Sequence, residues 1–428
     1  MTRHYIRATA LVAGAGAILV LAGAPSFADE VEDFYKGKRM TMYIGYSAGG
    51  GYDTYARLLS RHLGNHIPGN PSFVAKNRPG AGSLVLANEV FTTLPKDGTT
   101  VATIGRGIPM EPLFGNQKAK FDPRKFNWIG SLNNEVSVCA SWHATGITKF
   151  EDLKTGGMIV GGTAKGSDTD TFPTAMNNLL GTKLKLITGY PGGNDINFAI
   201  EKGEVQGRCG WSWSSVIGTR ASWLKEKKIN VLVQLSTDKH PDLPNVPLVM
   251  EKADNQRERD ILELIFARQL WGRPYFTTPG VPKARVAALQ AAFDATVKDP
   301  KFIAEAKKMR HELNPISGTV VQKAIEKVYA SPADIVAAAK QATEDQSKIS
   351  VAKAVVSEGK VSGKITKLEN GGRTIHWDAG GKTGSAGISG SRTKITVAGK
   401  AAKRSALKVG MTCTIDYKGA TTSSIVCP

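Results

Sequence analysis

A glycine-rich stretch from Gly45 to Leu59, GYSAGGGYDTYARLL, contains the residue types best suited to binding a small anion. Its three successive glycines, 49–51, can adopt positive φ angles without a Cβ clash, so neighbouring backbone N–H groups can point toward one place. They separate a strand-like run, Met40 to Tyr46, from a stretch with apolar residues at helical spacing. The corner therefore lies at the positive end of an expected helix, where a carboxylate or phosphate fits.

The same glycines equally suit a tight turn without a ligand, because a lone glycine-rich run is a weak signal. Two nucleotide-binding motifs are excluded: no Lys-Ser or Lys-Thr pair follows, and the spacing does not give GxGxxG with an acid downstream. Asp53 falls in the first turn of the expected helix, where its charge complements the dipole. Because it would repel a bare carboxylate, we assign it a supporting role.

Arginines and tryptophans elsewhere could complete such a site. Bidentate pairing with a ligand carboxylate is open to Arg106, Arg208 and Arg273, although each also suits a surface or structural role. We select Arg106, because it follows a strand-like run at the edge where ligands of open α/β sheets collect. Trp211 and Trp213 alternate with serine, which puts both indoles on one face of a strand. We expect one in the core and Trp211 in a pocket wall.

Strand and helix patterns alternate around these residues. Phe73 to Lys76 and Thr100 to Ile104 have the composition of strands, and Leu84 to Phe91 has helical periodicity between them. Residues 282–310 and 319–342 also have helical patterns. Such alternation is typical of an α/β fold with parallel strands.

The N-terminus has the features of a secretory signal peptide. Arg3 and Arg7 precede an apolar run, Ala8 to Ala24, which ends in a small-residue pattern that predicts cleavage after Ala28. An uncleaved anchor is the alternative, but the run is short and rich in alanine and glycine. The 428 residues carry a net charge of +19. Export disfavours nucleic acid as the partner of so basic a chain, and leaves anionic solutes or an anionic envelope surface.

Four cysteines in an exported chain favour two disulfides. Cys413 and Cys427 flank an expected hairpin that turns near Gly419, so they should pair. Cys139 and Cys209, both in strand-like runs, are then left to pair. A catalytic role for Cys139 is the alternative, but nothing else resembles a thiol enzyme. The cysteines and histidines lack zinc-site spacing, so we expect no metal and no cofactor.

A change of composition near residue 352 marks a domain boundary. Short β-prone runs separated by Gly, Ser and Asn follow, and Asn370-Gly371-Gly372 signals a hairpin. From residue 355 onward there are 12 Lys or Arg and 4 Asp or Glu. Segments such as Val361 to Ile365 and Leu407 to Thr412 resemble small barrel-like domains of secreted bacterial proteins. We therefore predict a small basic all-β, barrel-like domain, 355–428, either as a stabilised appendage or as a module that binds an anionic envelope polymer or a partner.

Six motifs in order make the chain similar to the Bug-type substrate-binding receptors of tripartite tricarboxylate transporters. The motifs lie between residues 34 and about 340, and the usual proline before the first glycine corner is replaced by Tyr46-Ser47. They are Gly49-Gly50-Gly51-Tyr52-Asp53 with Ala56-Arg57; Asn77-Arg78-Pro79-Gly80-Ala81-Gly82; the corner Gly162 to Ser167; Tyr190-Pro191-Gly192-Gly193 with Gly203-Glu204-Val205; Leu243-Pro244-Asn245-Val246-Pro247; and Thr278-Pro279-Gly280-Val281-Pro282.

The resemblance implies two α/β lobes, of the type 2-like periplasmic binding protein class, with a ligand carboxylate gripped in the central cleft between them. After the signal peptide at 1–28, it implies lobe one at 30–138 and 237–345, and lobe two at 139–236. The segment Lys165 to Thr169 also suits an anion site through its hydroxyls and helix start, or an ordinary N-cap. The expected ligand-binding residues are Ser47, Ala48, Gly49, Gly50, Gly51, Tyr52, Asp53, Arg106, Thr163, Lys165, Gly166, Ser167, Asp168, Thr169, Tyr190, Gly192, Gly193, Asn194 and Trp211.

The predicted function is therefore that of a periplasmic receptor, expected to be monomeric and not an enzyme, which delivers a small carboxylate to membrane transporter subunits. Two alternatives stay open. The first is an exported envelope-binding protein, a hypothesis that only the net charge of the chain supports. A secreted hydrolase would need a nucleophile elbow, and the segment Gly210 to Ser214 lacks its last glycine.

Overall fold

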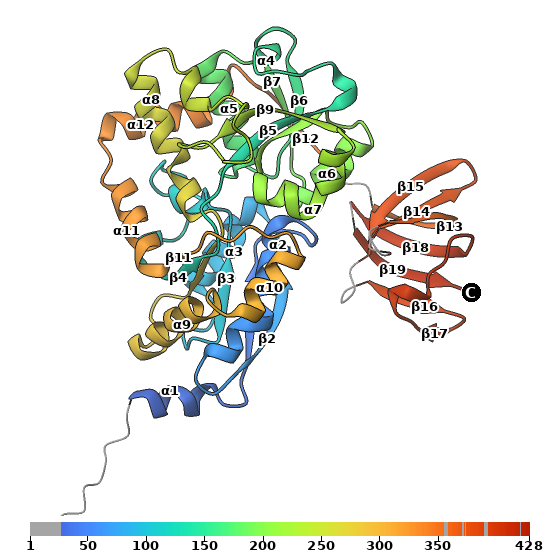
Figure 1. Ribbon diagram of the computed structural model, residues 1–428, viewed down its shortest axis with the longest axis horizontal. Coiled ribbons are helices and arrows are strands. Elements are labelled where there is room, and N and C mark those ends of the chain that lie inside the picture. Colours follow the sequence, from blue (N-terminus) through green and yellow to red (C-terminus); the bar gives the residue numbers. More distant parts are fainter. Residues whose placement is uncertain (1–26, 355–357, 370–371, 373, 389–392, 420) are drawn as a thin grey trace, which may run out of the picture.

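The computed structural model describes residues 27–354, 358–369, 372, 374–388, 393–419 and 421–428. These residues form two six-stranded mixed sheets covered by helices and a seven-stranded sheet that curls into a small barrel. The barrel is set to one side of the two α/β lobes (Figure 1). The fold is thus a two-lobed α/β protein with an additional C-terminal β domain, as the sequence predicts. Among the described residues, no helix has the length and apolar character needed to cross a bilayer.

The first lobe is built on a sheet with strand order β11-β4-β10-β3-β1-β2. β1 runs parallel to β2 and β3, whereas β10 is antiparallel to β3 and β4. Alternate residues of β1 are buried in a core with Tyr55, Leu59 and Phe293 from the covering helices. The strands are β1 (Arg39–Ile44), β2 (Ser72–Asn77), β3 (Thr100–Thr103), β4 (Asn127–Ser131), β10 (Pro274–Thr277) and β11 (Ile316–Ser317). The helices nearby are α1 (Phe27–Tyr35), α2 (Gly51–His62), α3 (Leu84–Thr92), α9 (Lys283–Thr296), α10 (Pro300–Lys308) and α11 (Gly318–Tyr329).

The second lobe has strand order β12-β7-β6-β8-β5-β9. Its last element in the chain, β12, lies in a segment that the sequence prediction assigned to neither lobe, and pairs in parallel with β7. α12 (Ala333–Glu344) packs against α5 and α8 of this lobe. The strands are β5 (Ser137–Trp142), β6 (Met158–Gly161), β7 (Leu184–Thr188), β8 (Gly207–Ser212), β9 (Ile229–Leu235) and β12 (Ser350–Lys353). The other helices are α4 (Asp152–Thr155), α5 (Asp168–Leu180), α6 (Gly193–Glu201), α7 (Trp213–Lys225) and α8 (Gln256–Phe266).

The C-terminal domain is a small closed barrel. β13 pairs antiparallel with both β14 and β18, and a parallel contact between β15 and β19 closes the ring. Its interior holds Ile365, Trp377, Ile415 and Ile425. The strands are β13 (Glu358–Glu369), β14 (Thr374–Ala379), β15 (Lys382–Gly387), β16 (Lys394–Val397), β17 (Lys400–Ala401), β18 (Thr412–Lys418) and β19 (Thr421–Cys427).

Most local predictions are confirmed by these elements. The strands expected at 40–46, 73–76 and 100–104 correspond to β1, β2 and β3, and the two helical ranges near the end of the receptor part each contain two helices. One prediction is wrong: Trp211 and Trp213 do not share a strand, because β8 ends at Ser212 and Trp213 is the first residue of α7. The hairpin turn at Asn370-Gly371 lies outside the described residues, although β13 and β14 on either side pair as a hairpin. Residues 1–26 are also outside, so cleavage after Ala28 stays a prediction.

Both predicted disulfides are present. Cys139 on β5 and Cys209 on β8 are direct cross-strand partners, and their bridge ties the two strands together. Cys413 and Cys427 join β18 to the end of β19 inside the barrel. The described part of the chain contains no free cysteine.

His311 is expected to make the stability of the protein sensitive to acid. Its ring stacks on Tyr55 at 4.1 Å, and burial, helped by Arg273, lowers its pKa to about 4. The unfolded chain therefore binds more protons than the native state between about pH 6.5 and pH 4. The free energy of unfolding should fall by about 3 kcal/mol as the pH falls through this window. Urea unfolding of His311→Phe, which keeps the stacking but cannot be protonated, should show a flatter pH profile; an equal fall in both proteins would contradict the assignment.

Candidate functional site

A cavity of about 50 Å³ lies where the two lobes meet. It can hold a few water molecules or a small solute, since one water needs about 10–15 Å³ by this measure. Segments from both lobes line it, and most of its lining residues lie at strand ends or helix starts. The lining consists of Tyr46, Gly50, Gly51, Tyr52, Gly105, Arg106, Thr163, Ser167, Asp168, Thr169, Gly193, Asn197, Arg208, Gly210, Trp211, Ser212, Ser215, Thr219 and Arg273.

Four helices begin at this cavity. The N-terminal ends of α2, α5, α6 and α7 contribute Gly51, Ser167, Gly193 and Ser212 to its wall, respectively. The first N–H groups of a helix have no intrahelical acceptor, and the helix dipole puts partial positive charge there. Each helix has at least nine residues. The arrangement therefore favours an anion in the cavity.

Asp53 orders the glycine corner from behind and does not line the cavity. Its carboxylate accepts the Gly49 N–H at 3.0 Å, the Arg57 guanidinium at 2.9 Å and the Asn77 side-chain amide at 2.7 Å. Asn77, from the second sequence motif, also donates to the Tyr46 carbonyl. Gly49 has φ +86°, which other residues rarely adopt. These bonds fix the chain at the start of α2.

The corners of the two lobes touch one another. The Ser47 N–H donates to the Pro191 carbonyl at 3.3 Å, and the Ser47 hydroxyl donates to the Asp195 carboxylate at 2.6 Å. A Cβ on Gly49 would lie 3.4 Å from the Asn194 side chain, and one on Gly192 would clash with the Ser47 hydroxyl. Small residues on both corners thus allow the lobes to close directly over the cavity.

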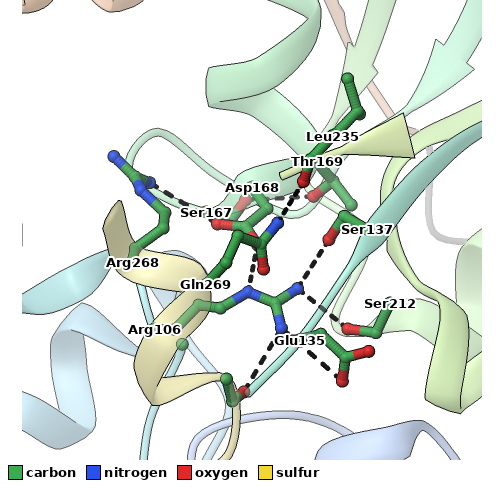
Figure 2. A network of polar contacts seen from close by, with 12 residues as sticks. Arg106, Glu135, Ser137, Ser167, Asp168, Thr169, Ser212, Leu235, Arg268 and Gln269 are labelled. Carbon is green, nitrogen blue, oxygen red and sulfur yellow. Dashed lines mark hydrogen bonds and ion pairs between the residues drawn. The ribbon is translucent and has the colours of Figure 1, made fainter. Parts of the chain in front are cut away.

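Arg106 is the centre of a buried polar network that crosses between the lobes (Figure 2). It follows β3 of the first lobe, and its guanidinium binds the Asp168 carboxylate at 2.5 Å and the hydroxyls of Ser137 and Ser212 at 2.9 Å. Glu135 lies 3.9 Å away. Burial is the largest single effect and lowers the pKa of Arg106, but the charges of Asp168, Tyr52 and Glu135 and the hydrogen bond to Asp168 together outweigh it, so the pKa is raised. Arg106 therefore remains charged and joins the lobes, with its charge already neutralised by the protein.

Arg273 is held in a second network of the same kind. It pairs with Glu135 at 3.2 Å and donates to the hydroxyls of Ser214 and Ser215 at 2.8 and 2.7 Å. Its guanidinium also covers the Tyr52 ring, at 4.7 Å. Like Arg106, it lines the cavity while its charge is matched by a carboxylate.

Arg208 differs from both, because no carboxylate of the described residues lies within ion-pairing distance of it. Its guanidinium makes only long hydrogen bonds, of 3.2 and 3.4 Å, to the Gly193 carbonyl and the Asn197 side chain. Burial, the largest cause, lowers its pKa to about 9, and the positive charges of Arg273, Arg220 and Arg106 act in the same direction while Tyr46 opposes them. The cavity therefore has an uncompensated cation in its wall.

The structure brings about half of the sequence-predicted site residues to the cavity. These are Gly50, Gly51, Tyr52, Arg106, Thr163, Ser167, Asp168, Thr169, Gly193 and Trp211. The others flank it without lining it: Ser47, Ala48, Gly49, Asp53, Lys165, Gly166, Tyr190, Gly192 and Asn194. Among them, Lys165 is exposed and pairs with Glu344, and Tyr190 is part of a core cluster of the second lobe.

The lining residues that were not predicted are Tyr46, Gly105, Asn197, Arg208, Gly210, Ser212, Ser215, Thr219 and Arg273. Several of them belong to the start of α7. Serines directly after a buried strand are a helix N-cap signal, so Ser212 could have been found from the sequence. Arg208 and Arg273 were considered as candidates, but their charge balance depends on partners that are distant in the chain.

The chemistry available here is that of binding. The lining has hydroxyls, backbone amides and arginines, and the described residues contain no group of three or more His, Cys, Asp or Glu that could hold a metal ion. The arrangement can neutralise and hydrogen-bond an oxyanion.

Comparison with known sequences gives partial matches. No protein-family model matches the chain. The UPF0065 protein in the gbd 5' region of Cupriavidus necator is 37% identical over 131 residues, which are 30% of this chain and 38% of that protein. The UPF0065 protein in the tcbD-tcbE intergenic region of Pseudomonas sp. (strain P51) is 23% identical over 290 residues, 65% of this chain and 79% of that protein. The chain thus spans less than half of the first relative and most of the second.

Comparison with solved structures identifies the fold. The periplasmic binding protein BugD has a TM-score of 0.56 at 18% identity, over 72% of this chain and 98% of BugD. MatC from Rhodopseudomonas palustris, solved with bound malate, has a TM-score of 0.54 at 18% identity, over 70% of this chain and 99% of MatC. A further R. palustris protein, solved with adipate, has a TM-score of 0.55, over 71% of this chain and 97% of that protein. The fold is that of the two-lobed periplasmic binding proteins, and the resemblance to Bug-type receptors that the six motifs indicate is confirmed.

Replacing Arg106 should destabilise the protein strongly. Arg106→Met leaves Asp168 without its nearest cation inside the protein, and breaking a buried ion pair costs about 3–5 kcal/mol. Arg257→Met, in an exposed pair with Asp334, is the matched control and should cost about 1 kcal/mol or less. Denaturant unfolding measures both. An Arg106→Met protein as stable as the control would show that the network does not hold the lobes together.

Proposed function

We propose that the protein is an exported solute receptor that captures a small carboxylate between its two lobes and delivers it to a tripartite tricarboxylate-type membrane transporter. The convergence of four helix N-termini on one cavity between the lobes is the observation that carries this proposal. The unmatched charge of Arg208 in the same wall adds to it. Receptors of the same fold have been solved with malate and with adipate, which supports a carboxylate as the anion.

A carboxylate loses its hydration when it enters this cavity, so the site must replace that hydration with donors. Each charge-assisted hydrogen bond contributes about 1.5–3 kcal/mol net. The N–H groups in the first turns of α2, α5 and α6, the Ser215 hydroxyl and the Arg208 guanidinium are donors of this kind. Esters and amides lack the charge, and therefore bind more weakly.

Binding and closing of the lobes are one equilibrium in this proposal. The cavity has walls from both lobes, so a ligand makes its full set of contacts only when they are closed. It therefore shifts a pre-existing equilibrium toward the closed form. The direct contacts of Ser47 with Pro191 and Asp195 belong to that form.

Location and partners follow from the same proposal. The leader predicted at 1–28 would direct the chain to the periplasm as a monomer, where it would meet the transporter subunits. The C-terminal barrel would bind an anionic envelope polymer. Charge supports this: seven exposed lysines of the barrel have no carboxylate within ion-pairing distance among the described residues. They are Lys360, Lys364, Lys382, Lys394, Lys400, Lys403 and Lys408.

Gly50→Val should abolish binding and leave the fold intact. Gly50 has φ −82° and ψ 171°, which valine adopts easily, and a Cβ there meets nothing closer than 3.7 Å, so the added side chain fills the cavity. We expect the affinity for the best ligand of a carboxylate panel to fall by about 100-fold or more, as loss of two or more charge-assisted bonds implies. Isothermal calorimetry measures the affinity, and NMR of the recovered solute tests for turnover.

Gly156→Ala, on the surface of the second lobe with nothing within 4 Å of the added Cβ, is the control and should bind as the wild type does. Unchanged affinity in Gly50→Val would show that the cavity is not the binding site. Chemical conversion of the solute by the wild type would favour the hydrolase alternative.

A further inference from the structure

His311 lies in the interface between the two lobes. Its ring stacks on Tyr55 of α2, in the first lobe, with 4.1 Å between the ring centres and 6° between the planes. Its edge faces the second lobe, because a Cβ on Gly218 of α7 would lie only 3.0 Å from its Nδ1 atom. Gly218 is about one helical turn beyond Ser215, which lines the cavity. Closing of the lobes therefore brings the backbone of α7 against this ring.

The His311 ring has no hydrogen-bond partner in this interface. The residue is 7% exposed, and neither Nδ1 nor Nε2 makes a hydrogen bond with any residue that the structure describes. A neutral imidazole is tolerated in such a place, whereas an imidazolium would be a buried charge without a carboxylate. The closed form therefore holds His311 neutral.

The charged groups that face His311 from the elements around it are cations. Burial is the main cause that lowers its pKa to about 4, and the charges of Arg273, before β10, and Arg61, on α2, act in the same direction. Nearby backbone groups, such as that of Arg310, oppose this effect only in part. The charged residue of α7 closest in sequence to Gly218 is Arg220, another cation. A proton on His311 would thus add positive charge to a positive environment.

The acid next to His311 in the chain is already paired. Glu312 binds His240 of the second lobe at 2.8 Å. Burial lowers the pKa of His240, but the hydrogen bond and charge of Glu312, together with the charges of Asp242 and Glu135, outweigh it, so the pKa is raised. This pair is strengthened when His240 is protonated, which is the opposite of what His311 requires. The effect of His311 therefore has to be isolated by substitution.

We propose that His311 is a proton-linked switch for closing: the lobes close over the cavity when its ring is neutral, and its protonation favours the open form and release of the solute. This inference rests on the proposed function, in which the closed lobes hold the solute. Water solvates the imidazolium when α7 moves away, whereas the closed interface does not. By linkage, solute binding expels the proton from His311, and acid weakens solute binding.

The test compares solute affinity at pH 7.0 and pH 5.0 in the wild type and in His311→Phe, which keeps a ring against Tyr55 but cannot be protonated. Acetate, malonate, succinate and glutarate are titrated by calorimetry into the mature full-length protein. With the ordinary histidine pKa of about 6.5 in the open form and about 4 in the closed form, the wild type should lose about 10- to 30-fold more affinity than His311→Phe on acidification. Protonation of the solute and of His240 occurs in both proteins and cancels in this ratio.

A control variant and a second measurement accompany this test. His143→Phe removes an exposed histidine of the second lobe and should show the wild-type loss of affinity. NMR titration of the His311 ring in the wild type measures its pKa directly. That pKa should fall by about one pH unit or more when the protein is saturated with a bound acid, because saturation populates the closed form.

The outcomes separate this inference from the proposed function. An equal loss of affinity in the wild type and His311→Phe would overturn the switch and leave the receptor function standing. A difference between the two proteins in the pH dependence of unfolding, without one in binding, would show that the first lobe alone buries the ring, and would also overturn it. If His311→Phe does not fold, a His311 pKa that is unchanged by bound acid would overturn it. Failure of every probe to bind the wild type at pH 7.0 would overturn the receptor function and the switch together.

Discussion

Burying a guanidinium group without a negative partner costs several kcal/mol, and this constraint shapes how the two lobes of this protein meet. Arg106 leaves the end of β3 in the first lobe and has almost no exposed surface. Its charge is matched by Asp168 at the start of α5, and its remaining donors reach Ser137 and Ser212 on strands of the second lobe. Asp168 is shared with Arg268, and Glu135 with Arg273. Closing the lobes thus assembles a charge network that neither lobe can complete alone.

The same network explains the character of the cavity beside it. Carboxylates of the protein neutralise Arg106 and Arg273, so these arginines shape the wall without attracting a solute strongly by charge. The anion-binding capacity then comes from the starts of α2, α5, α6 and α7 and from Arg208. Asp53 keeps its negative charge on the far side of the glycine corner, where Arg57 and Asn77 bind it. Attraction for an anion and stability of the closed form are thereby assigned to different residues.

Local sequence signals predicted those parts of the site that depend on local conformation. The glycines 49–51 indicated a turn before a helix, the Thr163–Thr169 segment indicated a helix start, and both lie at the cavity. The spacing of Cys413 and Cys427 around a turn predicted their bridge. Arg106 was selected for its place after a strand and does line the cavity, but its partner Asp168 is 62 residues away, so its neutralisation could not be foreseen.

The sequence was less informative where contacts between distant segments determine the local structure or the charge balance of a side chain. The alternation in Trp211-Ser212-Trp213 suggested one strand, yet the chain turns into α7 at Ser212, where the Trp213 N–H donates to the Val136 carbonyl at 2.8 Å. Arg208 has no local feature that distinguishes it from other arginines. Its neighbours come from several separate segments, and in the described part of the chain they include no carboxylate within ion-pairing distance.

Small-angle X-ray scattering with matched solutes tests the central claim most directly, namely that an acidic solute closes the two lobes over this cavity. The mature protein is measured alone, with its preferred carboxylate at saturation, and with the corresponding amide at the same concentration. The account predicts a smaller radius of gyration with the acid and no change with the amide, because only the acid gains the charge-assisted bonds from both lobes. Equal compaction with acid and amide, or no compaction with a bound acid, would contradict it.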